Sequence, residues 1–120
     1  ACTSTPKVCY ENSCFEVEVA ETLEQQSLGL MFRDSLDQNK GMLFVYESTE
    51  PRSFWMQNTF IPLDIIWIDS NFKVTKIQRA NPCQGPCEVY TGYGQYILEL
   101  NQGTANNLGL EVGEEIKIKI

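Results

Sequence analysis

The segment Ser53–Asp69 (SFWMQNTFIPLDIIWID) constrains the fold most, because both tryptophans and a dense apolar run lie within it. Pro62 disfavours helix at the residue before it. The six residues that follow, Leu63–Ile68, form a short apolar run of the kind that is typical of a buried β-strand. In a strand, Asp64 shares one face with Ile66 and Ile68, and the other three residues share the opposite face.

Apolar and turn-forming segments alternate along the rest of the chain. Thr22–Leu30 is predicted to be helical, with a capping-box spacing between Thr22 and Gln25, and a second short helix is predicted at Thr104–Leu108. Strands are predicted at residues 8–20 (a hairpin), 41–46, 53–56, 63–68, 72–78, 96–100 and 116–120.

About eight short strands with turn signals roughly every ten residues predict a mainly β fold. We expect an antiparallel β-sandwich or barrel, jelly-roll-like, with one or two short helices. A chain of 120 residues is long enough for one domain, predicted at residues 8–120, after a flexible tail at residues 1–7.

The composition excludes several classes of function. The net charge is −7 and the basic residues are scattered, which argues against a nucleic-acid or anionic-membrane surface. No apolar run approaches the ~20 residues of a transmembrane helix. The absence of histidine removes Ser-His-Asp and Cys-His catalysis and histidine metal sites, and we predict neither metal nor cofactor.

Four of the five cysteines form two close pairs, Cys9 with Cys14 and Cys83 with Cys87. We predict two local disulfides, and therefore an extracytoplasmic protein, whether secreted, periplasmic or on the cell surface. The alternative is one zinc site with all four thiolates as ligands, because the two spacings fit structural zinc motifs loosely.

The fifth cysteine, Cys2, follows Ala1, and this pair resembles the junction left by a lipoprotein signal. Cys2 is therefore a candidate lipid anchor. The alternative is an unpaired cysteine in a flexible tail.

Several motifs of the chain resemble a widespread prokaryotic family, the uncharacterised ancient conserved region also called domain of unknown function 192. The matching stretches are LGLMFR (28–33), GMLF (41–44), FWMQNT (54–59), PLDIIWID (62–69), PC (82–83), YILELN (96–101) and the closing Gly109 with Val112–Glu114. The resemblance implies a compact β-sandwich, often exported behind a signal or lipoprotein peptide, and no established activity. The two cysteine pairs resemble extracytoplasmic members, whereas Gln57 stands where a lysine is common.

Polar residues set among the tryptophans suggest a binding site. Our leading hypothesis is a non-catalytic binding module for a small polar ligand, such as an envelope glycan fragment, or for a protein partner. The candidate ligand-binding residues are Arg33, Trp55, Met56, Asn58, Thr59, Asp64 and Trp67.

Each polar candidate also has a structural interpretation. Asp64 could accept backbone N–H groups from the adjacent proline turn, and Asn58 and Thr59 are typical turn and cap residues. Arg33 could pair with Asp34, Asp37 or a core carboxylate.

Two other functions remain open at this point. The first is a glycosidase-like hydrolase in which Asp64 and Glu99 are the two carboxylates, which requires both to open into one pocket. The second is a structural or interaction domain in which the tryptophan segment is simply core.

Overall fold

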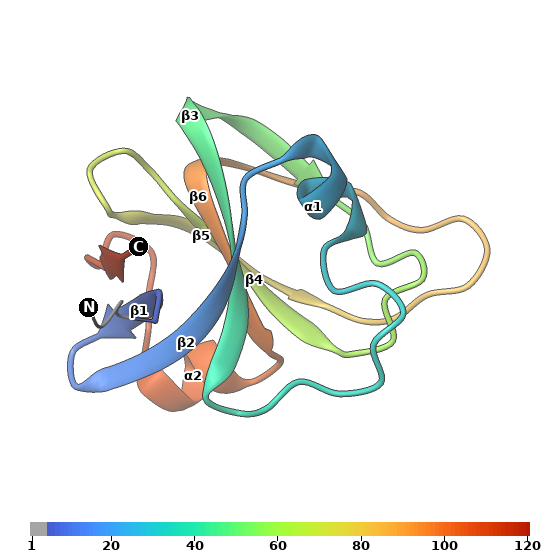
Figure 1. The fold of residues 1–120 in the computed structure, drawn as a ribbon, viewed down its shortest axis with the longest axis horizontal. Helices are drawn as coiled ribbons and strands as arrows, with labels where there is room; N and C mark the ends of the chain where they lie inside the picture. The colour runs from blue at the N-terminus through green and yellow to red at the C-terminus, as the bar shows by residue number, and fades with distance from the viewer. Residues whose placement is uncertain (1–4) are drawn as a thin grey trace.

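Seven strands form one curled sheet, in the order β5-β4-β6-β3-β2-β1-β7, which bends into a half-barrel (Figure 1). The computed structural model describes residues 5–120. The strands are β1 (Lys7–Tyr10), β2 (Ser13–Ala20), β3 (Lys40–Phe54), β4 (Leu63–Ile68), β5 (Val74–Ala80), β6 (Tyr90–Asn101) and β7 (Lys117–Lys119), and the helices are α1 (Leu23–Leu28) and α2 (Thr104–Leu108).

The prediction of a mainly β chain with two short helices is confirmed, but the sandwich and jelly-roll predictions are wrong. The strands of residues 5–120 form a single sheet, and it is mixed: β2 and β3 run parallel, while the other paired strands run antiparallel. The connection between β2 and β3 contains α1 and a long loop, so the chain can return to the starting end of β2 before β3 begins.

The longest strand, β3, contains the strand predicted at 41–46 and the first two residues of the strand predicted separately at 53–56. Its pairing with β6 shifts between Val45 and Glu50, and resumes at Glu50–Phe54. Pro51 lies in the resumed part, where β3 has β6 on one side and β2 no longer pairs with it. The missing N–H of a proline is tolerated at such an edge, so Pro51 does not end the strand.

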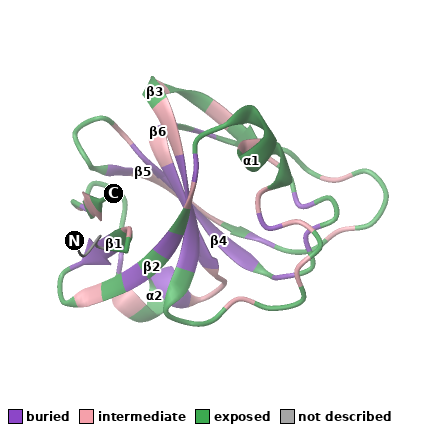
Figure 2. Ribbon diagram, viewed as in Figure 1, coloured by how far each residue is buried: buried purple, intermediate pink, exposed green. Residues whose placement is uncertain are grey.

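The core lies on both faces of the sheet, in two clusters of buried side chains. Figure 2 shows buried residues along the central strands. All six residues of β4 are buried. Ile66 and Ile68 belong to the cluster on the α2 side, whereas Leu63, Ile65 and Trp67 belong to the cluster on the α1 side. The alternation predicted for this strand is therefore confirmed.

Gly92 in β6 is required by the packing of Trp67. A Cβ at Gly92 would lie 2.6 Å from Cδ2 of the indole, which is fully buried. Gly92→Ala is therefore expected to lower the free energy of unfolding by about 1–3 kcal/mol through overpacking, measured by urea denaturation. The control Tyr93→Ala removes an exposed side chain on the same strand and should change stability by only about 0.5 kcal/mol. Equal effects of the two variants would contradict this prediction.

The capping box of α1 is confirmed. The backbone N–H of Gln25 donates to Thr22 Oγ1 at 3.1 Å, and the Gln25 side chain accepts from the backbone N–H of Thr22. None of the six helical residues is buried, so α1 lies on the surface and is tied to β3 by the Gln26 amide, which donates to the Val45 carbonyl at 3.0 Å.

Both predicted disulfides are present. The Cα atoms of Cys9 and Cys14 are 4.1 Å apart across the β1–β2 turn, and those of Cys83 and Cys87 are 5.9 Å apart. The four cysteines do not gather into one cluster, since residues 5–120 contain no group of three or more His, Cys, Asp or Glu side chains that could hold a metal ion, and this argues against the four-thiolate zinc alternative.

The proposed lipid anchor, Cys2, lies outside the described residues. Within the part of the chain that the structure describes, no helix has the length and apolar character needed to cross a membrane.

Candidate functional site

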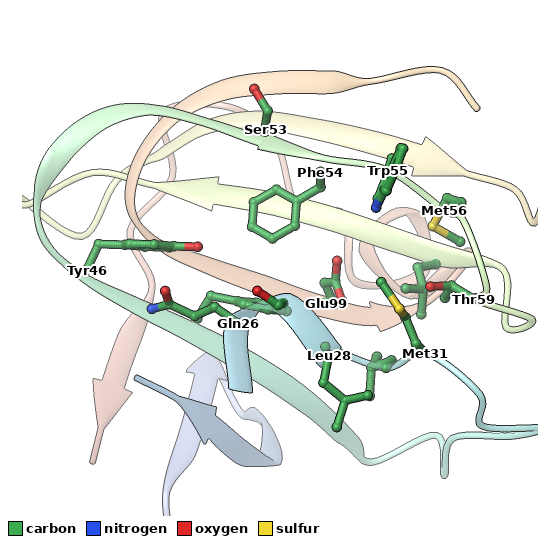
Figure 3. A pocket seen from close by; sticks show the side chains of 15 residues that line it. Gln26, Leu28, Met31, Tyr46, Ser53, Phe54, Trp55, Met56, Thr59 and Glu99 are labelled. Atoms are coloured by element: carbon green, nitrogen blue, oxygen red, sulfur yellow. The ribbon is translucent and has the colours of Figure 1, made fainter. Parts of the chain in front are cut away.

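A cavity of about 130 Å³ opens between the α1 region and strands β3 and β6 (Figure 3). We call it the Glu99 cavity. Two segments of the chain and five single residues line it: Gln26–Met31, Ser53–Met56, Phe44, Tyr46, Thr59, Leu63 and Glu99. Most of these side chains are apolar or aromatic, with a few hydroxyl and amide groups among them. This composition is typical of a small-molecule site.

Glu99 is the one carboxylate among the fifteen lining residues. It lies on β6 opposite Ile65 of β4 and Met42 of β3, and only 5% of the residue is exposed. Burial raises the pKa of Glu99 to about 8, and no hydrogen bond or nearby cation opposes this shift. A carboxyl group is thus held in an apolar cavity without a neutralising partner.

Tyr46 is the other ionisable side chain of the lining. Figure 3 shows its hydroxyl directed toward the centre of the cavity, on the opposite side of Glu99 from Met31 and Met56. Burial raises the pKa of Tyr46, Arg52 opposes this shift, and Glu99 adds to it.

Arg52 does not line the cavity. Its guanidinium carbon lies 4.0 Å from the centroid of the Tyr46 ring, and its Nη2 donates to the Ser48 carbonyl at 2.8 Å. Arg52 therefore supports the Tyr46 ring and the irregular part of β3, while the Glu99 carboxyl keeps no cationic partner in the cavity.

Three of the predicted ligand-binding residues meet in this cavity. Trp55 is 49% exposed, whereas Met56 and Thr59 are buried. All three lie in the loop that follows β3, which ends at Phe54. In Figure 3 the side chains of Met56 and Thr59 lie beside Met31, which the chain brings in from the end of α1.

Trp67 and Asn58 lie outside the lining. Trp67 is fully buried and its indole N–H donates to the Arg52 carbonyl at 2.9 Å, so its role is in the core. Asn58 is exposed, has a positive φ of 59°, and accepts the Phe32 N–H on its backbone carbonyl at 2.8 Å. This hydrogen bond ties the two loops that flank the cavity.

Asp64 caps a helix. Its Oδ2 accepts the N–H of Gly103 at 3.1 Å and the N–H of Ala105 at 2.9 Å, both at the start of α2. The donors are therefore not in the adjacent proline turn, which was the structural interpretation suggested by the sequence. Gly103 occupies the N-cap position of α2 and has no side chain to serve it. A carboxylate from β4 supplies the missing acceptor.

Arg33 pairs with Glu18 of β2, which is not among the partners that the sequence suggested. One guanidinium nitrogen donates to each carboxylate oxygen, with Nη2 at 2.9 Å from Oε1. The pairing lowers the pKa of Glu18 and raises that of Arg33. Arg33 is therefore held outside the cavity.

The proposed two-carboxylate site does not form. Asp64 of β4 lies opposite Leu100 of β6, and Glu99 of β6 lies opposite Ile65 of β4. The two acids therefore belong to neighbouring cross-strand pairs, and their side chains point to opposite faces of the sheet. Glu99 opens into the cavity beside α1, and Asp64 lies next to α2.

No sequence pattern predicts Tyr46, Met31 and Gln26 as site residues, because tertiary contacts bring them to the cavity. Glu99 did carry a signal. It interrupts the apolar strand Ile97–Leu100, and a carboxylate at an inward position must find a partner or perturb its pKa.

A family model for DUF192, described as an uncharacterised ACR, matches residues 7–118. The chain belongs to this family. Two curated members are similar to it: a UPF0127 protein of Thermococcus sibiricus, 28% identical over 83% of this chain and 64% of the relative, and the UPF0127 protein PH1112 of Pyrococcus horikoshii, 25% identical over 85% of this chain and 86% of the relative. The chain thus matches less than two thirds of the T. sibiricus protein.

Solved structures share the fold. A crystal structure from Sinorhizobium meliloti, described as a proposed transcription regulator, has a TM-score of 0.85 and 30% identity, covering 96% of this chain and 94% of that one. A protein of unknown function from Novosphingobium aromaticivorans has a TM-score of 0.81 and 34% identity, covering 94% of this chain and 83% of that one. These DUF192 and structural relatives support the half-barrel fold and name no ligand.

Proposed function

We propose that this DUF192 domain is a non-catalytic binding module that takes a small polar ligand into the Glu99 cavity. The observation that carries the proposal is a buried carboxyl group, without a neutralising partner, directed into an open cavity. Such a group costs stability in the folded protein, and strongly perturbed carboxyl groups in clefts are typical of functional sites.

The size of the cavity favours a small molecule. About 130 Å³ is well below the ~300–1,000 Å³ of sites for drug-sized ligands. An envelope glycan fragment could place at most part of one residue there, so we favour a compact polar molecule over an extended saccharide. The two disulfides support an extracytoplasmic location for this binding, because disulfides persist in oxidising compartments.

A protein partner is a second candidate function. Phe32 and Phe60 form an edge-to-face pair with ring centroids 6.5 Å apart, and they are 62% and 53% exposed. Phe32 lies on the loop that follows α1, and Phe60 lies on the loop that follows β3, which also carries the half-exposed Trp55. Exposed aromatic groups of this kind are enriched at protein interfaces. The transcriptional role proposed for the S. meliloti protein would require such a partner here, because the net charge of −7 disfavours direct DNA contact.

The proposal is tested with a panel of small amines, alcohols, sugars and carboxylates at millimolar concentration. Binding is detected by thermal shift and located by amide chemical shifts in NMR spectra. We expect at least one compound to raise the melting temperature and to perturb the amides of Leu30 and Thr59. Trp55→Ala should lower the affinity for that compound by about tenfold, which corresponds to about 1.4 kcal/mol of binding free energy.

Phe60→Ala is the matched control, because it removes an exposed aromatic ring from the same loop but not from the cavity lining. It should leave the affinity unchanged. A panel without any binder, or binders that perturb only residues outside the cavity, would contradict the proposed function.

A further inference from the structure

We propose that the Glu99 cavity selects a small organic cation, with an ammonium head group placed between the Glu99 carboxylate and the aromatic side chains of the lining. This inference rests on the proposed function and names the chemical class of its ligand.

The charge of the lining favours a cationic ligand over an anionic one. None of the fifteen lining residues is Lys or Arg, and the chain has no histidine. An anionic ligand would have to be buried beside Glu99 without a cation to pair with it, which is strongly unfavourable. A ligand cation would instead provide the partner that the carboxylate lacks.

The aromatic side chains of the lining also favour a cation. Tyr46, Phe54 and Trp55 contribute to the lining together with Phe44, and Figure 3 shows the first three arranged around the space above Glu99. The faces of aromatic rings attract cations, and rings that surround a site are used for quaternary ammonium groups. Arg52 already makes such a contact with the Tyr46 ring, 4.0 Å from its centroid, from outside the cavity.

The volume of the Glu99 cavity fits a small head group. About 130 Å³ is close to the ~150 Å³ of an engineered protein cavity that binds benzene. The Glu99 cavity therefore has room for a head group of about the size of trimethylammonium.

The cation should bind to the ionised form of Glu99, so binding at neutral pH releases the proton of this carboxyl group. The groups that face Glu99 allow its titration to be observed. From β3, burial raises the pKa of the Tyr46 hydroxyl, and Met42 is uncharged; from β4, Ile65 is apolar. The lining residues of the α1 region, Gln26–Met31, are uncharged. Arg52 contacts the Tyr46 ring from outside the cavity.

The test compares choline with 3,3-dimethylbutan-1-ol, which has the same shape but carries no charge. Affinities are measured by isothermal titration calorimetry at pH 6, 7, 8 and 9, and binding is located by NMR. We expect the affinity for choline to rise by nearly tenfold per pH unit below the pKa of Glu99, and to level off above about pH 8. At pH 9 the neutral alcohol should bind at least tenfold more weakly.

Glu99→Gln should abolish the pH dependence of choline binding, and should lower the affinity for choline at pH 9 by at least tenfold. Glu16→Gln makes the same change in net charge at an exposed site outside the cavity and should leave the affinity unchanged. Equal affinity for both compounds at pH 9, an affinity for choline that does not rise with pH, or no binding of choline at all would overturn the inference. If the neutral alcohol binds in the cavity and choline does not, the proposed function stands and the cationic ligand is wrong.

Discussion

Glu99→Gln is expected to raise the free energy of unfolding at pH 7 by about 3 kcal/mol, and the melting temperature by about 10 °C. The folded protein must keep the Glu99 carboxyl protonated, with a pKa of about 8, whereas the unfolded chain ionises it at its ordinary value of 4.5. Each pH unit between 4.5 and 7 therefore favours unfolding by about 1.4 kcal/mol. A neutral amide of the same size removes this penalty.

The sign of the pH dependence follows from the raised pKa. Between pH 4.5 and 8 the folded state binds the proton and the unfolded state has lost it, so the stability falls as the pH rises. The contribution of Glu99 is fully present below pH 4.5 and is lost as the pH passes through about 8. The variant should lack this slope.

Urea denaturation of both proteins at pH 5, 7 and 9 measures the difference, which should grow from pH 5 to pH 9. Glu16→Gln, at an exposed position, should change the stability by only about 0.5 kcal/mol at any of these pH values. A Glu99→Gln protein that is less stable than the parent at pH 7 would show that the carboxylate has a stabilising partner and would remove the main support for the binding site.

Asp64→Ala is expected to lower the free energy of unfolding by about 3 kcal/mol. The substitution leaves the N–H groups of Gly103 and Ala105 without their acceptor at the start of α2, in a position where Asp64 is only 2% exposed. Unsatisfied buried donors cost about 1–3 kcal/mol each, and the loss of a helix cap costs about 1 kcal/mol. Urea denaturation measures the change.

Asp69→Ala is the matched control, since Asp69 also accepts two backbone N–H groups, from Asn71 at 2.9 Å and Lys73 at 3.0 Å, in a solvent-exposed turn. Water can replace that acceptor, so we expect a loss of about 1 kcal/mol. Equal losses for the two variants would contradict a buried capping role for Asp64. Binding in the Glu99 cavity should survive Asp64→Ala below its melting temperature, because Asp64 lies on the other face of the sheet.

Local features of the structure could be predicted from the sequence wherever neighbouring residues decide them. The alternation in β4, the capping box of Thr22 and Gln25, and the disulfide between Cys9 and Cys14 across a tight turn all depend on residues within a few positions of one another. The mainly β character follows from the same short-range patterns.

The sheet topology depends on contacts between distant residues, and the antiparallel sandwich predicted from the sequence is wrong for this reason. The parallel pairing of β2 with β3 and the continuation of β3 past Pro51 depend on β6, which pairs with β3 from the other end of the chain. A polar segment with a proline is typical of a loop when it is considered alone, and only a partner strand at the right register makes it part of a sheet.

Part of the candidate site could likewise be predicted from the sequence, and part of it depends on the tertiary structure. The sequence by itself indicated polar residues set among the tryptophans of Ser53–Asp69, and an acid within each of two apolar strands. Only the tertiary structure decided that Asp64 caps α2 while Glu99 opens into a cavity with Tyr46 and Met31. The reason is that the face to which a strand residue points has a period of two along the chain, but what lies on that face is set by the register of distant strands and by the loops that cover it.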